Sequence, residues 1–322
     1  MLNRRSLLLT ASSLPIIGAA HHAAGQSTWV PTRDVEFVVP FAVGGGADLL
    51  ARVMHKIIVD EKLVPVSIAL NNRPGGGGAT GISYVTSRKA ADPHTIILVN
   101  GSTQITPILN AAAKTLSEVR PIMNVMLDDF LLFVKGDAPW KDAKEFVATA
   151  KSSPPKSIPF ATGGTTDVMA IAVFAKASGA EYNVLNFNSG GEALTQLLGG
   201  HVQASMGNPL EFMGHLQSKA VRALGVFRDD RFAGLPDIPT MKEQGIIAPN
   251  FQMWRGVAMP KGAPDDAARY WEGIFAKVVA TPAYKAYIKE NVASEAPIAG
   301  AAFAKFLEEQ EKLYRDLLGK PA

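Results

Sequence analysis

Short apolar runs alternate along the chain with longer segments in which apolar residues recur at helical spacing. The run VEFVVPF, which begins at Val35, is almost continuously apolar, as expected of a strand buried on both faces. A glycine turn follows, and residues 49–58 then carry one apolar stripe at helical spacing. A second strand, a second helix and the strand His94–Asn100 repeat the pattern. Two strand–turn–helix units and a third strand predict a parallel sheet with right-handed crossovers.

The middle of the chain repeats this arrangement. Residues 157–180 read as strand, glycine turn and helix, and they mirror residues 36–58. Further strands and a helix follow up to Phe227, then a loop-rich stretch, a strand at 251–260 and two closing helices. Two similar α/β lobes predict a ligand cleft between them, because ligands bind beyond the carboxyl ends of strands in open α/β sheets.

The N-terminus has the features of a secretory signal. Arg4 and Arg5 precede an apolar run, Leu7–Ala20, of about 14 residues, whereas a membrane span needs roughly 20. A small-residue stretch with Ala23 and Gly25 then suits a cleavage site. We therefore interpret residues 1–25 as a signal peptide, with the arginine pair pointing to the twin-arginine route. A buried N-terminal helix is the alternative, but it would bury both arginines.

Composition narrows the possible functions. Hydrophobic residues make up 47% and charged residues 19%, which is typical of a globular protein. The net charge is +3 without a basic block after the signal, so nucleic acid is not expected as a partner. The absence of cysteine excludes disulfides, thiolate metal sites, a cysteine nucleophile and a lipid anchor on cysteine.

The stretch NNRPGGGGATG raises the alternative of a dinucleotide-binding enzyme. Gly76, Gly78 and Gly81 fit the spacing G-x-G-x-x-G. That fingerprint also needs an acid at the end of the next strand, but this strand ends in Asn100-Gly101. No G-x-S-x-G or H-E-x-x-H motif occurs, and the histidines lack metal-ligand spacing. We therefore predict no enzyme activity, no cofactor and no metal.

Two glycine turns instead predict an anion site. PFAVGGGAD and ATGGTTD each lead from a strand into a helix, so their backbone N–H groups lie at a helix N-terminus, which favours an anion. Because one turn belongs to each lobe, a small carboxylate held between them is the expected ligand.

Several motifs in order resemble one family over nearly the whole mature chain. VVPFAVGGGADLLAR resembles its strand and G-G-x-x-D signature, and NNRPGGGGATG its N-R-P-G-A-G-G-x-x-G loop. ADPHTIIL, IPFATGGTTD, NFNSGGEALTQLLGGHVQASMGN, LPDIPTMKEQG and WRGVAMPKGAP follow at family spacing. The family is that of the Bug, or TctC-like, solute-binding proteins of tripartite tricarboxylate transport systems.

The resemblance implies a two-lobed periplasmic binding protein of the flytrap type (type II), each lobe a mixed sheet flanked by helices. It implies lobe 1 at 26–126 and 227–322, lobe 2 at 127–226, and chain crossings near Asn100–Met126 and Phe227. A monomer would capture a small carboxylate in the periplasm and deliver it to membrane permease subunits. A sensor that docks on a signalling receptor is the alternative, because the same fold serves both. The implied ligand contacts are Phe41, Val43, Gly44, Gly45, Gly46, Asp48, Gly77, Gly78, Thr80, Thr162, Gly163, Thr165, Thr166, Asn188, Gly190 and Asn208.

The chain also departs from the family pattern. Met169 stands at the usual histidine position, and NFNSG replaces V-P-Y-K-G, so Asn188 lies where a lysine is usual. Asn208 stands near a usual aspartate. Without that lysine we expect no cation at this end of the ligand, and a preference for less charged groups.

Overall fold

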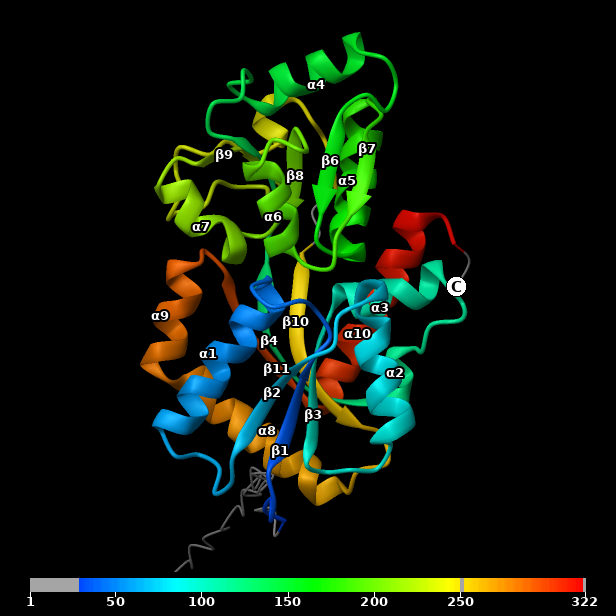
Figure 1. The fold of residues 1–322 in the computed structure, drawn as a ribbon, viewed down its shortest axis with the longest axis vertical. Helices are drawn as coiled ribbons and strands as arrows, with labels where there is room; N and C mark the ends of the chain where they lie inside the picture. The colour runs from blue at the N-terminus through cyan, green and yellow to red at the C-terminus, as the bar shows by residue number, and fades with distance from the viewer. Residues whose placement is uncertain (1–28, 250–251, 321–322) are drawn as a thin grey trace, which may run out of the picture.

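The computed structural model describes residues 29–249 and 252–320, so the predicted signal peptide lies outside the described residues. Two α/β lobes follow one another along the long axis of the molecule, with the green and yellow-green lobe 2 above lobe 1 in Figure 1. Each lobe contains one sheet flanked by helices, as the sequence predicted.

Lobe 1 is built on a mixed six-stranded sheet. In spatial order its strands are β11 (Ser294–Ala299), β4 (Val119–Asp128), β10 (Met253–Pro260), β3 (Thr95–Asn100), β1 (Val35–Val39) and β2 (Ile68–Asn72). β1 pairs in parallel with β2 and β3, as two strand–turn–helix units require. β10 runs antiparallel to both β3 and β4, because it returns from the other lobe.

Helices cover both faces of this sheet, which explains the continuous apolar runs. Phe37 and Val39 pack against α1 (Gly46–Asp60), α8 (Asp265–Ala280) and α9 (Pro282–Glu290). Val38 belongs to the core on the opposite face, with α2 (Ala79–Arg88), α3 (Gly101–Leu109) and α10 (Gly300–Leu318). Successive residues of a strand point to opposite faces, so a strand covered on both faces is apolar throughout.

Lobe 2 has a five-stranded sheet with the same layered plan. Its spatial order is β7 (Asn183–Asn186), β6 (Pro159–Thr162), β8 (Ala204–Gly207), β5 (Leu131–Lys135) and β9 (Val221–Val226). α4 (Ala143–Ser152) and α5 (Thr165–Ser178) belong to the core on one face, and α6 (Gly190–Leu198) and α7 (Pro209–Gln217) to that on the other. The rings of Phe133 and Phe212 stack 3.9 Å apart, which fixes α7 on β5.

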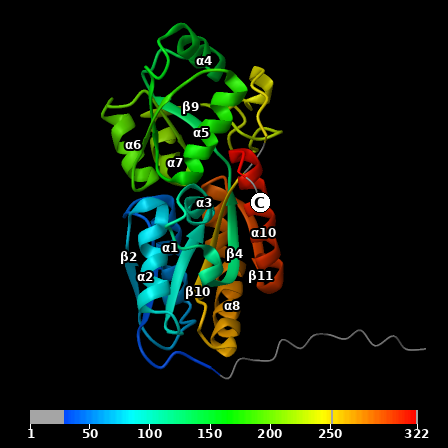
Figure 2. The same cartoon turned by 90° about the vertical axis from the view of Figure 1, so that its right-hand side faces the viewer.

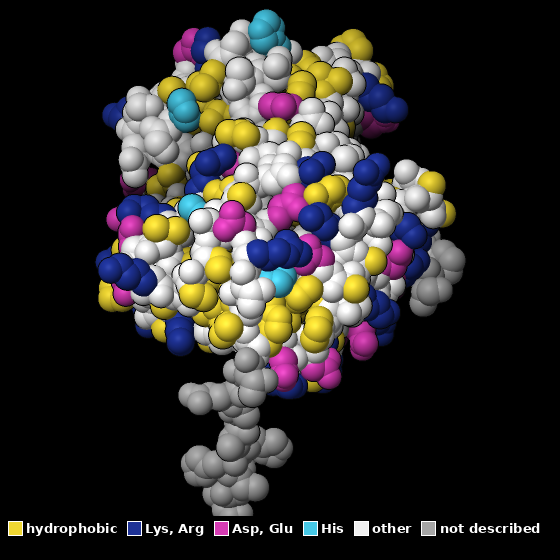
Figure 3. All heavy atoms as spheres, turned by 60° about the horizontal axis from the view of Figure 1, so that its bottom comes forward, with side chains coloured by type: hydrophobic (Ala, Val, Ile, Leu, Met, Phe, Trp, Pro, Cys, Tyr) yellow, Lys and Arg dark blue, Asp and Glu magenta, His cyan; other side chains and the backbone are white. Residues whose placement is uncertain are grey.

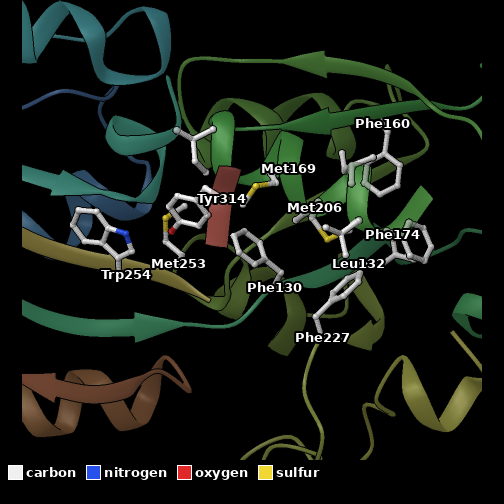
Figure 4. Close-up of a cluster of buried hydrophobic side chains, with 14 of the residues drawn as sticks. Phe130, Leu132, Phe160, Met169, Phe174, Met206, Phe227, Met253, Trp254 and Tyr314 are labelled. Atoms are coloured by element: carbon white, nitrogen blue, oxygen red, sulfur yellow. The ribbon is translucent and has the colours of Figure 1, made fainter. Parts of the chain in front are cut away.

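The chain passes between the sheets twice, and the apolar core continues across this region. It leaves lobe 1 after Asp128 and returns between Val226 and Met253. Figure 4 shows Phe130, Met169, Met253 and Tyr314 gathered there, from the crossing, α5, β10 and α10. Figure 2 shows α10 on the side of these crossings, so that side joins the lobes through packed side chains.

Three parts of the structure differ from the sequence predictions. Only the C-terminal end of the segment Asn100–Met126, where a crossing was expected, lies near the crossing after Asp128, and the rest forms α3 and most of β4 within lobe 1. α7 was not predicted. Three helices, not two, follow β10, because Pro282 starts a new helix and β11 then pairs with the edge of β4. Three single 3-10 turns complete the described elements: η1 (Gly76–Gly78), η2 (Leu116–Glu118) and η3 (Lys242–Gln244).

The surface carries both signs of charge. On the face seen in Figure 3, Lys and Arg side chains are interspersed with Asp and Glu, and no continuous basic stripe crosses it. Such a stripe is the usual footprint of a nucleic-acid-binding protein. Within residues 29–249 and 252–320, no helix has the length and apolar character needed to cross a bilayer.

Candidate ligand-binding site

Five helices from both lobes begin around one small cavity. α1 and α3 come from lobe 1, and α5, α6 and α7 from lobe 2. The lining residues are Phe41, Gly45, Gly46, Ala47, Asn100, Ser102, Gly163, Gly164, Asp167, Ser189, Gly190, Gly207, Asn208, Glu211, Met253 and Arg255. The first N–H groups of a helix have no partner inside it and carry partial positive charge, so this cavity favours anions. Its volume is about 20 Å³, close to the space of one water, so the lobes are closed on each other.

Each lobe contributes a glycine turn held by an aspartate four residues further on. Asp48 Oδ2 accepts the N–H of Gly44 over 2.9 Å, and Asp167 Oδ2 accepts that of Gly163 over 2.8 Å. These bonds fold the turn back onto the first turn of α1 or α5 and leave the following amides at the cavity. The sequence indicated that residues 157–180 mirror residues 36–58, and this similarity is therefore one of turn geometry.

The two aspartates differ in their neighbours and in their pKa. Burial by itself would raise the pKa of Asp48, but hydrogen bonds from Arg52, Gly44 and Asn72 lower it below the usual value. Asp167 has no such cation, because Ile171 stands four residues after it. Burial raises the pKa of Asp167 to about 7, although the Gly163 N–H opposes the shift. Asp48 is thus a structural anion, whereas Asp167 faces the cavity as a titratable group.

The two lobes touch through backbone at the cavity rim. A Cβ placed on Gly45 would lie 2.7 Å from Ser189 Cβ, and one on Gly191 would lie 2.7 Å from the carbonyl oxygen of Gly44. The sequence places glycine on both sides of this contact, because any larger residue would hold the lobes apart.

α3 supplies a further link between the lobes. Ser102 Oγ accepts the N–H of Thr166 over 3.1 Å and lies 2.9 Å from Thr166 Oγ1. Thr165 Oγ1 also donates to the carbonyl oxygen of Ser102 over 3.0 Å. The N-terminus of α3 is fixed by a capping box between Asn100 and Thr103. Ser102 was not among the predicted site residues, because α3 was not predicted.

Arg255 brings a cation to the cavity beside Asn208, although Asn188, at the position of the usual lysine, supplies none. Arg255 is 2% exposed, donates from Nε to Asp128 Oδ2 over 2.8 Å and from Nη2 to Asn208 Oδ1 over 3.1 Å. Burial raises the pKa of Asp128 to about 7 even though Arg255 opposes the shift. The sequence held one signal for this site: a single charged residue within the apolar strand β10, since buried arginines are usually paired.

Glu211 is the second residue that the sequence prediction missed. It lies in the first turn of α7, and its Oε1 accepts the N–H of Gly46 over 2.6 Å from the other lobe. Leu210 beside it packs into the core of lobe 1. The first turn of α7 therefore closes the cavity with a carboxylate from lobe 2 on the helix start of lobe 1.

The structure brings together only part of the predicted contact set. Phe41, Gly45, Gly46, Gly163, Gly190 and Asn208 line the cavity. Val43 is 66% exposed, and Asn188 is exposed and donates to Glu192.

The other predicted residues lie behind the cavity lining and shape the turns. Gly44 and Asp48 fix the first turn, and Thr162 Oγ1 donates to Asn186 over 2.8 Å. A Cβ on Gly77 would lie 2.5 Å from Thr106 Oγ1, one on Gly78 2.6 Å from Thr103, and the Thr80 hydroxyl packs on Gly75. Thr165 and Thr166 join α5 to α3.

The geometry does not offer a metal centre. Among residues 29–249 and 252–320, no three His, Asp or Glu side chains are grouped so that they would hold an ion. His94, for example, contacts the N–H of Thr32 and the Trp29 ring, far along the chain from the glycine turns.

Comparison with known proteins identifies the family. Residues 50–320 match the model of the tripartite tricarboxylate transporter family receptor, TctC. The chain belongs to the TctC family. Protein BugT of Bordetella pertussis is 29% identical over 261 residues, which cover 79% of this chain and 79% of BugT.

Solved structures share the TctC fold. The periplasmic binding protein BugD has a TM-score of 0.83 at 23% identity, covering 90% of this chain and 97% of BugD. MatC of Rhodopseudomonas palustris, solved with bound malate, has a TM-score of 0.82 at 22% identity, covering 89% of this chain and 99% of MatC. The predicted family and two-lobed fold are confirmed. Because TctC proteins are receptors, the prediction of a binding protein that is not an enzyme is confirmed as well.

Proposed function

We propose that this TctC protein captures a small organic carboxylate between its lobes and delivers it to a tripartite tricarboxylate-type membrane transporter. The observation that carries the proposal is the convergence of five helix N-termini from both lobes on one cavity. Such N-termini bind carboxylates through backbone N–H groups and the helix dipole. The malate bound to MatC, which shares the fold, supports the same class of ligand.

Ligand entry in this proposal requires the lobes to separate. The closed cavity holds about one water, whereas even a four-carbon acid is several times larger. The two chain crossings hold the lobes together, so separation of the lobes away from these crossings would expose the glycine turns to solvent. We propose that the moving bodies are lobe 1, made of residues 26–126 and 227–322, and lobe 2, made of residues 127–226.

The family and the N-terminal sequence support a periplasmic setting. We propose that residues 1–25 direct export, by the twin-arginine route, and are cleaved, leaving a monomer in the periplasm. Mass spectrometry of the exported protein tests this directly: a mature N-terminus near Gln26 is expected, and an intact Met1 would contradict it. Docking of the loaded protein on permease subunits is favoured over a signalling receptor because the family is defined by transporter receptors.

Thermal shift measurements on the mature protein test the carboxylate proposal. The panel contains mono- and dicarboxylates, amino acids, aromatic acids and NAD. A ligand present at 100 times its Kd stabilises the folded state by about 2.7 kcal/mol. At least one carboxylate is expected to raise the melting temperature, and a response to NAD alone would overturn the proposal.

A further inference from the structure

Glu211 places a carboxylate of the protein at the N-terminus of α1. Its Oε1 lies 2.6 Å from the backbone nitrogen of Gly46 at the start of α1. A Cβ on Gly190 would lie 2.6 Å from the same oxygen, so the carboxylate also lies against the start of α6. One side chain thus occupies the space between a helix N-terminus of each lobe.

The charges around Glu211 are dominated by carboxylates. A Cβ on Gly46 would lie 2.7 Å from Glu211 Oε1 and 2.9 Å from Arg255 Nη2, so the two groups flank Gly46. Arg255 is already bound through Nε by Asp128. Asp167 lines the same cavity. The cluster therefore has three carboxylates for one guanidinium, and the raised pKa values of Asp128 and Asp167, both about 7, reflect this crowding as well as burial.

Two carboxylate oxygens of the cluster lack a donor. Glu211 Oε2 and Asp128 Oδ1 are buried and have no hydrogen-bond partner. Buried polar atoms in folded proteins are nearly always paired, so an unpaired carboxylate oxygen marks a place where a donor is missing. A ligand carboxylate cannot fill that place, because it only accepts hydrogen bonds.

We propose that Glu211 selects ligands that carry an ammonium group beside a carboxylate, and that it disfavours dicarboxylates. The inference rests on the carboxylate-binding function proposed above and names the ligand class. An ammonium donates to Glu211 Oε2 and reduces the excess of negative charge, while the helix amides that Glu211 leaves open hold the ligand carboxylate. A second ligand carboxylate would instead approach Glu211 as a like charge.

Isothermal titration of the mature protein with matched ligand pairs tests this inference. Each dicarboxylate with two to four methylene groups is compared with the ω-amino acid that has the same number of methylenes. Propanoate is compared with alanine, and succinate with aspartate. The ammonium-bearing member of the pairs that bind is expected to bind at least tenfold more tightly.

The variant Glu211→Gln keeps the side-chain shape and removes the charge. It is expected to lower the preference for the ammonium member by at least tenfold. Glu308→Gln is the matched control, because it removes one exposed glutamate charge on α10 and should leave the preference unchanged.

The possible outcomes separate the two proposals. A wild-type preference for the dicarboxylates, or for the members without ammonium, overturns the role of Glu211 and leaves carboxylate binding intact. An unchanged preference in Glu211→Gln does the same. Binding of none of these acids, in a protein that circular dichroism shows to be folded, overturns carboxylate binding and the role of Glu211 together. If Glu211→Gln does not fold, the ratio of the wild-type affinities for the two members of each ligand pair decides the test by itself.

Discussion

Arg255 donates from Nε to Asp128 Oδ2 over 2.8 Å, and both side chains are almost fully buried. Asp128 is the last residue of β4, directly before the chain crosses to lobe 2. Arg255 lies near the start of β10, where the chain has just returned. The ion pair therefore joins the two strands at the ends from which both crossings leave, and Arg255 also reaches Asn208 of lobe 2.

Replacing Arg255 with Met should destabilise the protein by about 3 kcal/mol, because buried Asp128 loses its paired guanidinium and must take up a proton to remain buried. The double variant Asp128→Asn with Arg255→Met should lose less than the sum of the two single variants, since no unpaired charge remains. Urea unfolding at pH 7 measures all three. Strictly additive losses would contradict the coupling, and Lys56→Met, in the exposed pair with Asp60, should change stability by less than about 0.5 kcal/mol.

Gly191→Ala should weaken ligand binding at least tenfold while leaving each lobe folded. Its Cβ would lie 2.7 Å from the carbonyl oxygen of Gly44 in the other lobe, and backbone cannot move aside without reopening the cavity. Titration gives the affinity of Gly191→Ala for the ligand. Small-angle scattering gives the change in radius of gyration on adding ligand, and this change should be smaller in the variant than in wild type, or absent.

Gly273→Ala is the control for this substitution. A Cβ on Gly273, in α8, meets no atom within 4 Å, so binding should be unchanged and stability should rise by about 0.5–1 kcal/mol. Full affinity in Gly191→Ala would mean that ligand binding does not need this backbone contact.

Ser102→Ala should reduce affinity about fivefold. The substitution leaves the N–H of Thr166 without its acceptor in the closed form, which costs about 1 kcal/mol. That loss applies only to the closed form if Ser102 and Thr166 separate when the lobes open. Unfolding of the unliganded protein should change less than its affinity, and Ser83→Ala, on the exposed face of α2, should alter neither. Equal affinity in wild type and Ser102→Ala would exclude this link from closure.

The parts of the fold that were predicted from sequence are those with a local cause. The apolar run of β1 and the glycine turn before α1 are both contained in the residues concerned, and the same holds for β6 and α5. α3 was not predicted, because its sequence GSTQITPIL contains Pro107 and several residues of low helix propensity. Packing against α5 and α10 decides its structure instead. β11 exists only because the edge of β4 is available to pair with it.

The site residues, too, were predicted where the cause is local and missed where it is not. The aspartate-held glycine turns are local, so the motifs indicated them. Glu211 lies 165 residues from Gly46, and only the closed arrangement of the lobes brings this pair together. Arg255 lies 127 residues from Asp128, and the antiparallel pairing of β10 with β4 within lobe 1 brings these two together. Proline at the start of α7, followed by Glu211 in its first turn, was a sign of a helix N-terminus but carried no information about the partner lobe.

Asp167 should make stability fall as pH rises from about 5 to about 7. Its pKa is raised to about 7 in the folded protein, chiefly by burial, whereas the unfolded chain releases the proton near its ordinary value of 3.8. Between these values the folded state binds more protons, so the free energy of unfolding decreases by up to about 1.4 kcal/mol per pH unit from this residue. Well below pH 4 and well above pH 7 its contribution is constant.

Asp167→Asn isolates this effect, because the amide oxygen still accepts the N–H of Gly163 while the titrating proton is gone. Urea unfolding at pH 5, 6 and 7 should therefore show the variant gaining stability relative to wild type as pH rises. Asp48→Asn provides the contrasting case, since the lowered pKa of Asp48 adds stability at pH values above its ordinary pKa, and that contribution is lost only as the solution becomes acidic. If the stability curves of wild type and Asp167→Asn run parallel between pH 5 and 7, Asp167 is already ionised in the folded protein. In that case the lack of a cation at position 171 does not make the pKa of Asp167 differ from that of Asp48.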